Sequence, residues 1–109
     1  MNADELLAGL PGEDLIREGV ADLEAGRVSV AACLAALAFP RLQRVGLLRE
    51  LPPGLAADVE LQLYRLLRHS GGDAYSRYNA LLRRLISFEQ ALDRRTVKWQ
   101  LPANAVRAD

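Results

Sequence analysis

Side chains suited to nucleophilic or metal chemistry are few and far apart in this sequence. His69 is the single histidine and Cys33 the single cysteine of the 109 residues. Ser70 follows His69 directly, but a catalytic triad needs a nucleophile, a base and an acid in one geometry, which adjacency in sequence does not supply. A structural zinc ion needs four ligands, and one cysteine cannot form an internal disulfide. We therefore expect no metal ion, and we expect His69 to be solvated at a helix end.

Neighbouring carboxylates are the other candidates for catalysis. Glu13 with Asp14, and Asp22 with Glu24, have the residue types of an acid and base pair. Both pairs lie on the polar side of an expected amphipathic helix, where solvation is the simpler role. The sequence contains neither a GxxxxGK[ST] nor a GxGxxG loop, so it predicts no nucleotide cofactor. We predict that the chain is not an enzyme, and an enzyme with an unrecognised site is the second alternative.

Arginines provide the candidate contact for an anion or a nucleic-acid backbone. Arg77 and Arg84 are seven residues apart and share one helix face, which Arg83 extends. The zero net charge of the chain opposes strong nonspecific binding to nucleic acid. Pairing with Glu89 or with the acidic N-terminal segment is the simpler interpretation. The candidate arginines are Arg41, Arg44, Arg77, Arg83 and Arg84.

Residues 29–47 also have roughly the lengths of a helix-turn-helix, with a turn at 38–40. Arg41 and Arg44 would then lie on its second helix. Gly46 cuts that helix short, the turn lacks a glycine, and the first helix is too apolar to lie exposed over DNA. A nucleic-acid-binding regulator is therefore an alternative that we do not favour.

Charge is distributed unevenly along the chain. Residues 1–26 contain seven acids against Arg17, a balance of −6, and residues 65–95 contain seven arginines against three acids, a balance of +4. The simpler interpretation is attraction between these segments, within the fold or across a dimer. An anion-binding face is the sharper one.

Apolar residues in the last third of the chain point to a protein partner. Between Tyr78 and Leu92 they recur at steps of three and four residues, the seam spacing of a helix packed along another. Tyr75, Leu82 and Ile86 widen this face. The widened face is large enough to contact both the core of the domain and a second surface. Beyond Thr96, apolar and polar residues alternate, and tryptophan is a frequent interface anchor. The candidate partner-binding residues are Tyr78, Leu85, Phe88, Leu92, Trp99 and Leu101.

Caps and stops divide the chain into helices. Asn2, Ser29 and Asp73 are expected N-caps, and Gly26 is an expected stop. The expected helices are a short first one, then 11–25, a nearly nonpolar central one at 30–38, a short turn at 41–45, 55–69 and 74–94. This predicts an all-α fold, a compact orthogonal bundle of five to six helices. Residues 1–95 form one domain, and residues 96–109 form a flexible or docking tail.

The sequence favours a cytoplasmic, bacterial protein without a membrane segment. The N-terminus lacks the charged and apolar pattern of a signal peptide, and no apolar stretch is long enough to span a bilayer. A single Cys33 within an apolar run is expected to be buried and suits a reducing compartment. We favour a non-enzymatic protein-interaction module, in concrete form a small regulatory or antitoxin-type subunit, that binds another protein or forms a homodimer.

Overall fold

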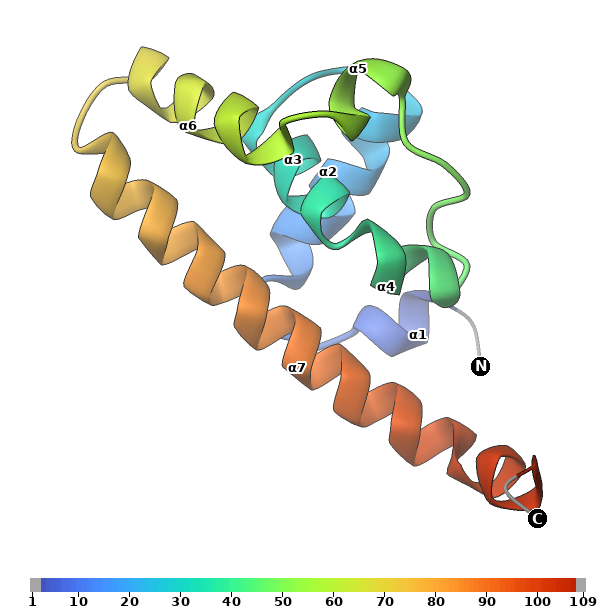
Figure 1. Ribbon diagram of the computed structural model, residues 1–109. Coiled ribbons are helices and arrows are strands. Elements are labelled where there is room, and N and C mark those ends of the chain that lie inside the picture. Colours follow the sequence, from blue (N-terminus) through green and yellow to red (C-terminus); the bar gives the residue numbers. More distant parts are fainter. Residues whose placement is uncertain (1–2, 108–109) are drawn as a thin grey trace.

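The computed structural model describes the backbone of residues 3–107 and the side chains of residues 4–55 and 57–97. This part of the chain is all-helical and contains no β-strand, as expected. The shorter helices stack on one side of the longest one (Figure 1). The seven helices among the described residues are α1 (Ala3–Leu7), α2 (Glu13–Glu24), α3 (Val30–Leu37), α4 (Phe39–Arg44), α5 (Pro53–Ala56), α6 (Val59–His69) and α7 (Ala74–Arg107).

The nearly nonpolar helix α3 is the centre of the fold, as its sequence indicates. It packs against α2, α4, α5, α6 and α7, and every residue from Ala31 to Ala36 is buried. A helix without a polar face is stable only when neighbours cover it on all sides. Its small side chains let those neighbours approach closely.

The expected caps form where they were predicted, within the described residues. The Ser29 hydroxyl accepts a hydrogen bond from the backbone amide of Ala32 at 3.0 Å and begins α3. A carboxylate oxygen of Asp73 accepts one from the amide of Ser76 at 3.1 Å and begins α7. Gly26 follows α2 with a φ of 75°, the left-handed conformation that ends many helices. The expected Asn2 cap lies outside the described residues.

The expected helix over 55–69 is wrong at its start, because a break divides it into α5 and α6. Asp58 adopts a φ of 55°, the left-handed region that aspartate tolerates better than most residues. The side-chain amide of Gln62 donates to the carbonyls of Gly54 (2.8 Å) and Ala57 (3.2 Å). These bonds satisfy carbonyls that a continuous helix would have used itself. This break raises the number of described helices above the five or six expected.

Helix α7 is longer than predicted and runs the length of the molecule. It was expected to end near Arg94 and to be followed by a tail, but the described helix continues to Arg107. A straight helix of 34 residues would be about 51 Å long, whereas α7 bends near its C-terminal end (Figure 1) and the longest extent of the molecule is 52 Å. The far end projects beyond the other helices (Figure 1). The side chains of Trp99 and Leu101 lie outside the described residues.

The core unites residues from all parts of the chain. Phe88 and Leu92 of α7 are buried together with Leu7, Leu42 and Leu63 from three other helices. Burying a side chain of this size stabilises a fold by roughly 1.5–3 kcal/mol. No helix in the described part of the chain is both long enough and apolar enough to cross a membrane.

Candidate functional site

The apolar seam predicted to bind a partner is largely the chain's own core. Leu85, Phe88 and Leu92 are 7%, 0% and 1% exposed. Tyr78 is half-buried, and its ring packs edge-to-face on Tyr64 of α6, with ring centroids 5.7 Å apart. Seam spacing on a helix predicts packing but does not say against which chain. Here the neighbouring helices of the same chain occupy that face.

A second face of α7 carries exposed apolar side chains. Tyr75, Ile86 and Val97 are 67%, 51% and 55% exposed. They are spaced eleven residues apart, and eleven residues turn a helix by three full turns and about 20°. The three side chains therefore lie on one face, which we name the α7 stripe. The three side chains stand about 16 Å apart along the helix, and Asp93, on the same face between Ile86 and Val97, pairs with Arg41.

The α7 stripe adjoins a groove between α6 and α7, which we name the tyrosine groove. Its volume is about 820 Å³. All three tyrosines of the chain line it, and Tyr75 belongs to both the groove and the stripe. The described residues that line it are Leu37, Asp58, Val59, Glu60, Leu61, Tyr64, Tyr75 and Tyr78.

The charged residues that line the tyrosine groove are both acidic. Asp58 and Glu60 are exposed at its rim. The Tyr78 hydroxyl donates a hydrogen bond to a carboxylate oxygen of Glu60 at 3.4 Å. Burial, with a smaller contribution from the negative charge of Glu60, raises the pKa of Tyr78. The phenol therefore remains neutral and a donor at physiological pH.

The five candidate arginines do not form one surface. Arg41 of α4 binds Glu89 and Asp93 of α7, with nitrogen to oxygen distances of 3.1 and 3.0 Å. Arg84 and Asp93 are nine residues apart, which places them on opposite sides of α7. Arg41 and Arg84 are thus separated by the helix itself.

The remaining candidate arginines are exposed or hold the local fold. A guanidinium nitrogen of Arg77 donates to the Ser70 hydroxyl at 2.7 Å and to the Gly71 carbonyl at 2.9 Å, so Arg77 closes the turn between α6 and α7. Arg83 and Arg44 are exposed on separate helices. No observation favours the nucleic-acid alternative, and it is not carried further.

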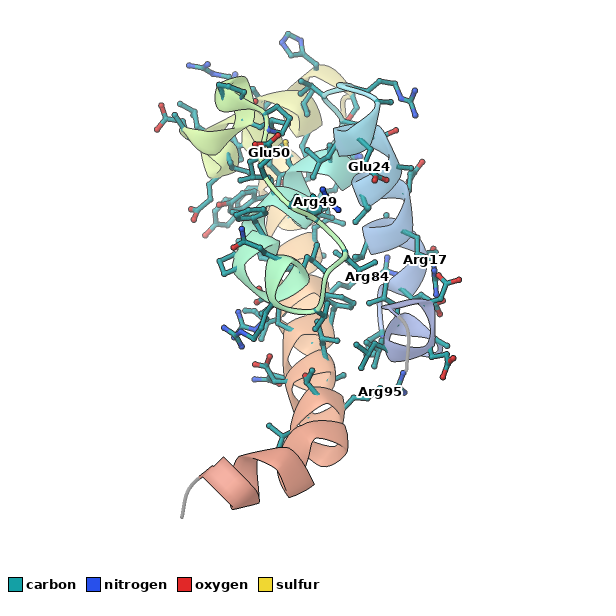
Figure 2. The ribbon with its side chains drawn as sticks, turned by 90° about the vertical axis from the view of Figure 1, so that its right-hand side faces the viewer. Arg17, Glu24, Arg49, Glu50, Arg84 and Arg95 are labelled. Atoms are coloured by element: carbon teal, nitrogen blue, oxygen red, sulfur yellow. The ribbon has the colours of Figure 1, made fainter. Side chains whose placement is uncertain are left out.

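The acidic and basic segments meet at one edge of α7. Among the described residues, one ion pair joins them, Arg84 with Asp14 at 3.8 Å, and both side chains are more than half exposed. Arg95 instead donates to the backbone carbonyls of Leu6 (2.9 Å) and Ala8 (2.6 Å) at the end of α1. Arg84 and Arg95 lie on the side of α7 that faces α1 and α2 (Figure 2). Most of the charge asymmetry remains on the surface.

The side chains considered for catalysis are apart or engaged elsewhere. The Ser70 hydroxyl donates to the carbonyl of Leu67 at 2.9 Å, and His69 is exposed at the end of α6. Cys33 is fully buried, and burial raises the pKa of its thiol. Within the described part of the chain, no three His, Cys, Asp or Glu side chains gather as a metal-binding group.

A second groove lies between the end of α2 and the loop that leads to α5. Leu23, Glu24 and residues 46–53 line it. Arg49 and Glu50 are exposed there on the loop, near Glu24 (Figure 2). The described lining of this second groove contains both acidic and basic residues and no aromatic side chain. It therefore favours no particular class of ligand.

The tyrosine groove was not predicted from the sequence. Tyr75 was recognised as part of a wide apolar face, but Tyr64 and Glu60 come from another helix and join it only through the packing of α6 on α7. The spacing of eleven residues between Tyr75, Ile86 and Val97 is visible in the sequence and could have identified the α7 stripe. Comparison of the chain with protein-family models, with curated proteins and with solved structures gives no match.

Proposed function

We propose that this protein is a helical interaction module that binds a partner polypeptide along the α7 stripe and into the adjoining tyrosine groove. The register of Tyr75, Ile86 and Val97 carries the proposal, because exposed apolar side chains on one helix face are what a partner helix or strand buries. A small regulatory subunit is the version of this function that we favour.

The length of α7 supports this function. The α7 stripe runs from Tyr75 to Val97, about 33 Å of helix, and a partner that follows it meets the groove at one end. Specific interfaces need an apolar centre with a polar rim. The arginines of α7 at positions 83 and 94 are exposed beside the stripe and supply such a rim.

Site-specific photo-crosslinking in the native host tests the proposal. A photoreactive phenylalanine derivative is placed at position 86 in one variant and at position 18 in another. Glu18 is exposed on α2, so both substitutions leave the core intact. We expect an adduct of defined mass at position 86 and none at position 18. The same adducts at both positions, or none at either, would contradict the proposal.

The variant Ile86→Glu provides the second measurement. Ile86 is 51% exposed, so a charge there leaves stability nearly unchanged while placing a desolvated carboxylate in the interface. We expect the partner, identified by mass spectrometry from the position-86 adduct, to bind this variant at least tenfold more weakly. Glu18→Gln is the matched control and should bind like the unmodified chain.

A further inference from the structure

The tyrosine groove combines three aromatic rings with two acidic residues, Asp58 and Glu60, the charged members of its lining among the residues whose side chains are described. We propose that it binds the partner polypeptide through one basic side chain, an arginine or a lysine, which lies over the tyrosine rings and pairs with Glu60. This inference rests on the proposed function, because it names the chemistry of the partner.

The rings are arranged to receive a cation. The face of an aromatic ring is electronegative and attracts an ammonium or guanidinium group within about 6 Å. Tyr64 and Tyr78 meet at an interplanar angle of 80°, so they form two walls of a corner. Tyr75 is 67% exposed at the rim, where a third ring meets an entering side chain first.

The carboxylates have free capacity to pair with that cation. Glu60 accepts a single long hydrogen bond from Tyr78, and a carboxylate accepts several. Asp58 stands at the N-cap position of α6, yet its side chain makes no capping hydrogen bond. Both charges are therefore available to a ligand, and both repel an anion such as a phosphate.

The groove fits a polypeptide better than a small free cation. Its volume of about 820 Å³ falls within the range of roughly 300–1,000 Å³ for sites that hold drug-sized ligands, and a single ammonium group fills a small part of it. Leu37, Val59 and Leu61 provide apolar surface beside the acids. Tyr75 makes the groove continuous with the α7 stripe, along which the remaining partner residues extend.

Peptide titrations followed by NMR test this inference. The probe is a capped pentapeptide with a central arginine between apolar residues, and its twin carries citrulline, which has nearly the same shape but no charge. We expect the arginine peptide to shift the amide signals of Tyr75 and Tyr78. The citrulline peptide should bind roughly fivefold more weakly, the ratio that a cation–π contact of about 1 kcal/mol gives.

Two variants and a control locate the binding. Tyr75→Ala removes an exposed ring, and Glu60→Gln removes a charge while keeping an acceptor for Tyr78. Each should weaken the arginine peptide about threefold to tenfold and reduce its preference over citrulline. Glu24→Gln, an exposed acid at the end of α2 and outside this groove, should have no effect.

Several results would overturn the inference. They are equal binding of the two peptides, unchanged binding by both groove variants, and guanidinium chloride shifting the same signals as tightly as the peptide does. Concentration-dependent shifts at Tyr75 and Tyr78 without peptide would show instead that a second copy occupies the groove. A position-86 adduct in the unmodified chain, together with equal binding of the arginine and citrulline peptides to that chain, would overturn this inference and leave the proposed function standing. Absence of that adduct, with the arginine preference retained in the unmodified chain, would contradict the proposed function while the groove still binds a basic side chain.

Discussion

Gly19 of α2 lies directly against the backbone of Ala31 in α3. A Cβ atom built at Gly19 would be 2.1 Å from the Ala31 carbonyl oxygen and 2.9 Å from the Cβ of Ala35. No real contact is that short, so only a glycine permits this separation of the two helices. The approach of α2 to α3 is therefore fixed by the absence of one side chain, although Gly19 has ordinary helical geometry.

The variant Gly19→Ala should lower the free energy of unfolding by about 3 kcal/mol, the upper end of the usual cost of overpacking. The neighbours that must move are backbone atoms, which cannot rotate away. Gly54→Ala is the matched control, because nothing lies within 4 Å of a Cβ built there. Urea denaturation measures both, and equal stabilities would show that α2 and α3 are not packed in this way.

The Ser29 cap connects α3 to α2. Its hydroxyl accepts from Ala32 and donates to a carboxylate oxygen of Asp22 at 2.6 Å. Ser29→Ala should cost about 1 kcal/mol of stability, the usual value of an N-cap. Ser87→Ala, an exposed serine within α7, controls for the loss of a hydroxyl. Thermal unfolding should rank the Ser29 variant clearly below the control, and identical midpoints would contradict the cap.

Part of the free energy of unfolding depends on pH through the Asp22 carboxylate. Hydrogen bonds from Ser29 and then Arg27 lower the pKa of Asp22. A lowered folded-state pKa contributes stability above the unfolded-state value, near pH 4, and this contribution is lost as the pH falls through the folded-state value. Asp22→Asn should therefore be less stable than the unmodified chain at pH 7, and the difference should shrink on acidification. A difference independent of pH would contradict this assignment.

Glu89 should give the opposite pH dependence. Burial raises its pKa, while Arg41 opposes the rise. A raised folded-state pKa contributes stability below the unfolded-state value, and this is lost as the pH rises through the folded-state value. Because Arg41→Ala removes the opposing charge, this variant should lose stability more steeply between about pH 4 and pH 7.

Arg41→Ala should also cost about 1 kcal/mol at pH 7, a value discounted because the Arg41 side chain is 36% exposed and screened by solvent. Arg44→Ala, exposed on the same helix, is its control and should change little. Urea titrations at several pH values measure both variants. An Arg44 variant as destabilised as the Arg41 variant would show that helix propensity, and not the ion pairs with α7, explains the loss.

The Cys33 thiol should be inert in the folded protein. It is fully buried and its pKa is raised by burial, so both access and thiolate formation are suppressed. Labelling by an aromatic disulfide reagent should be roughly a hundredfold or more slower in buffer than in denaturant, since it requires opening of the core. Similar rates in the two conditions would place Cys33 at the surface.

Local signals predicted the elements that depend on local interactions. Ser29 and Asp73 begin helices because their own side chains satisfy nearby amides. The apolar composition of α3 predicted its central place. The break at Asp58 was missed, because it depends on Gln62 reaching back to two carbonyls, and no sequence pattern announces such a contact.

Caps, stops and apolar spacing are enough to predict that the chain is helical, where most helices begin, and that α7 has more apolar surface than one seam requires. Which of these apolar residues form the core and which stay exposed depends on how the helices pack. Phe88 is buried and Ile86 is half exposed, although both are apolar residues of the same helix. The reason is that periodicity defines faces of a helix, whereas the neighbours that cover a face come from distant parts of the chain. The meeting of Tyr64, Tyr75 and Tyr78 beside Glu60 is a consequence of that packing.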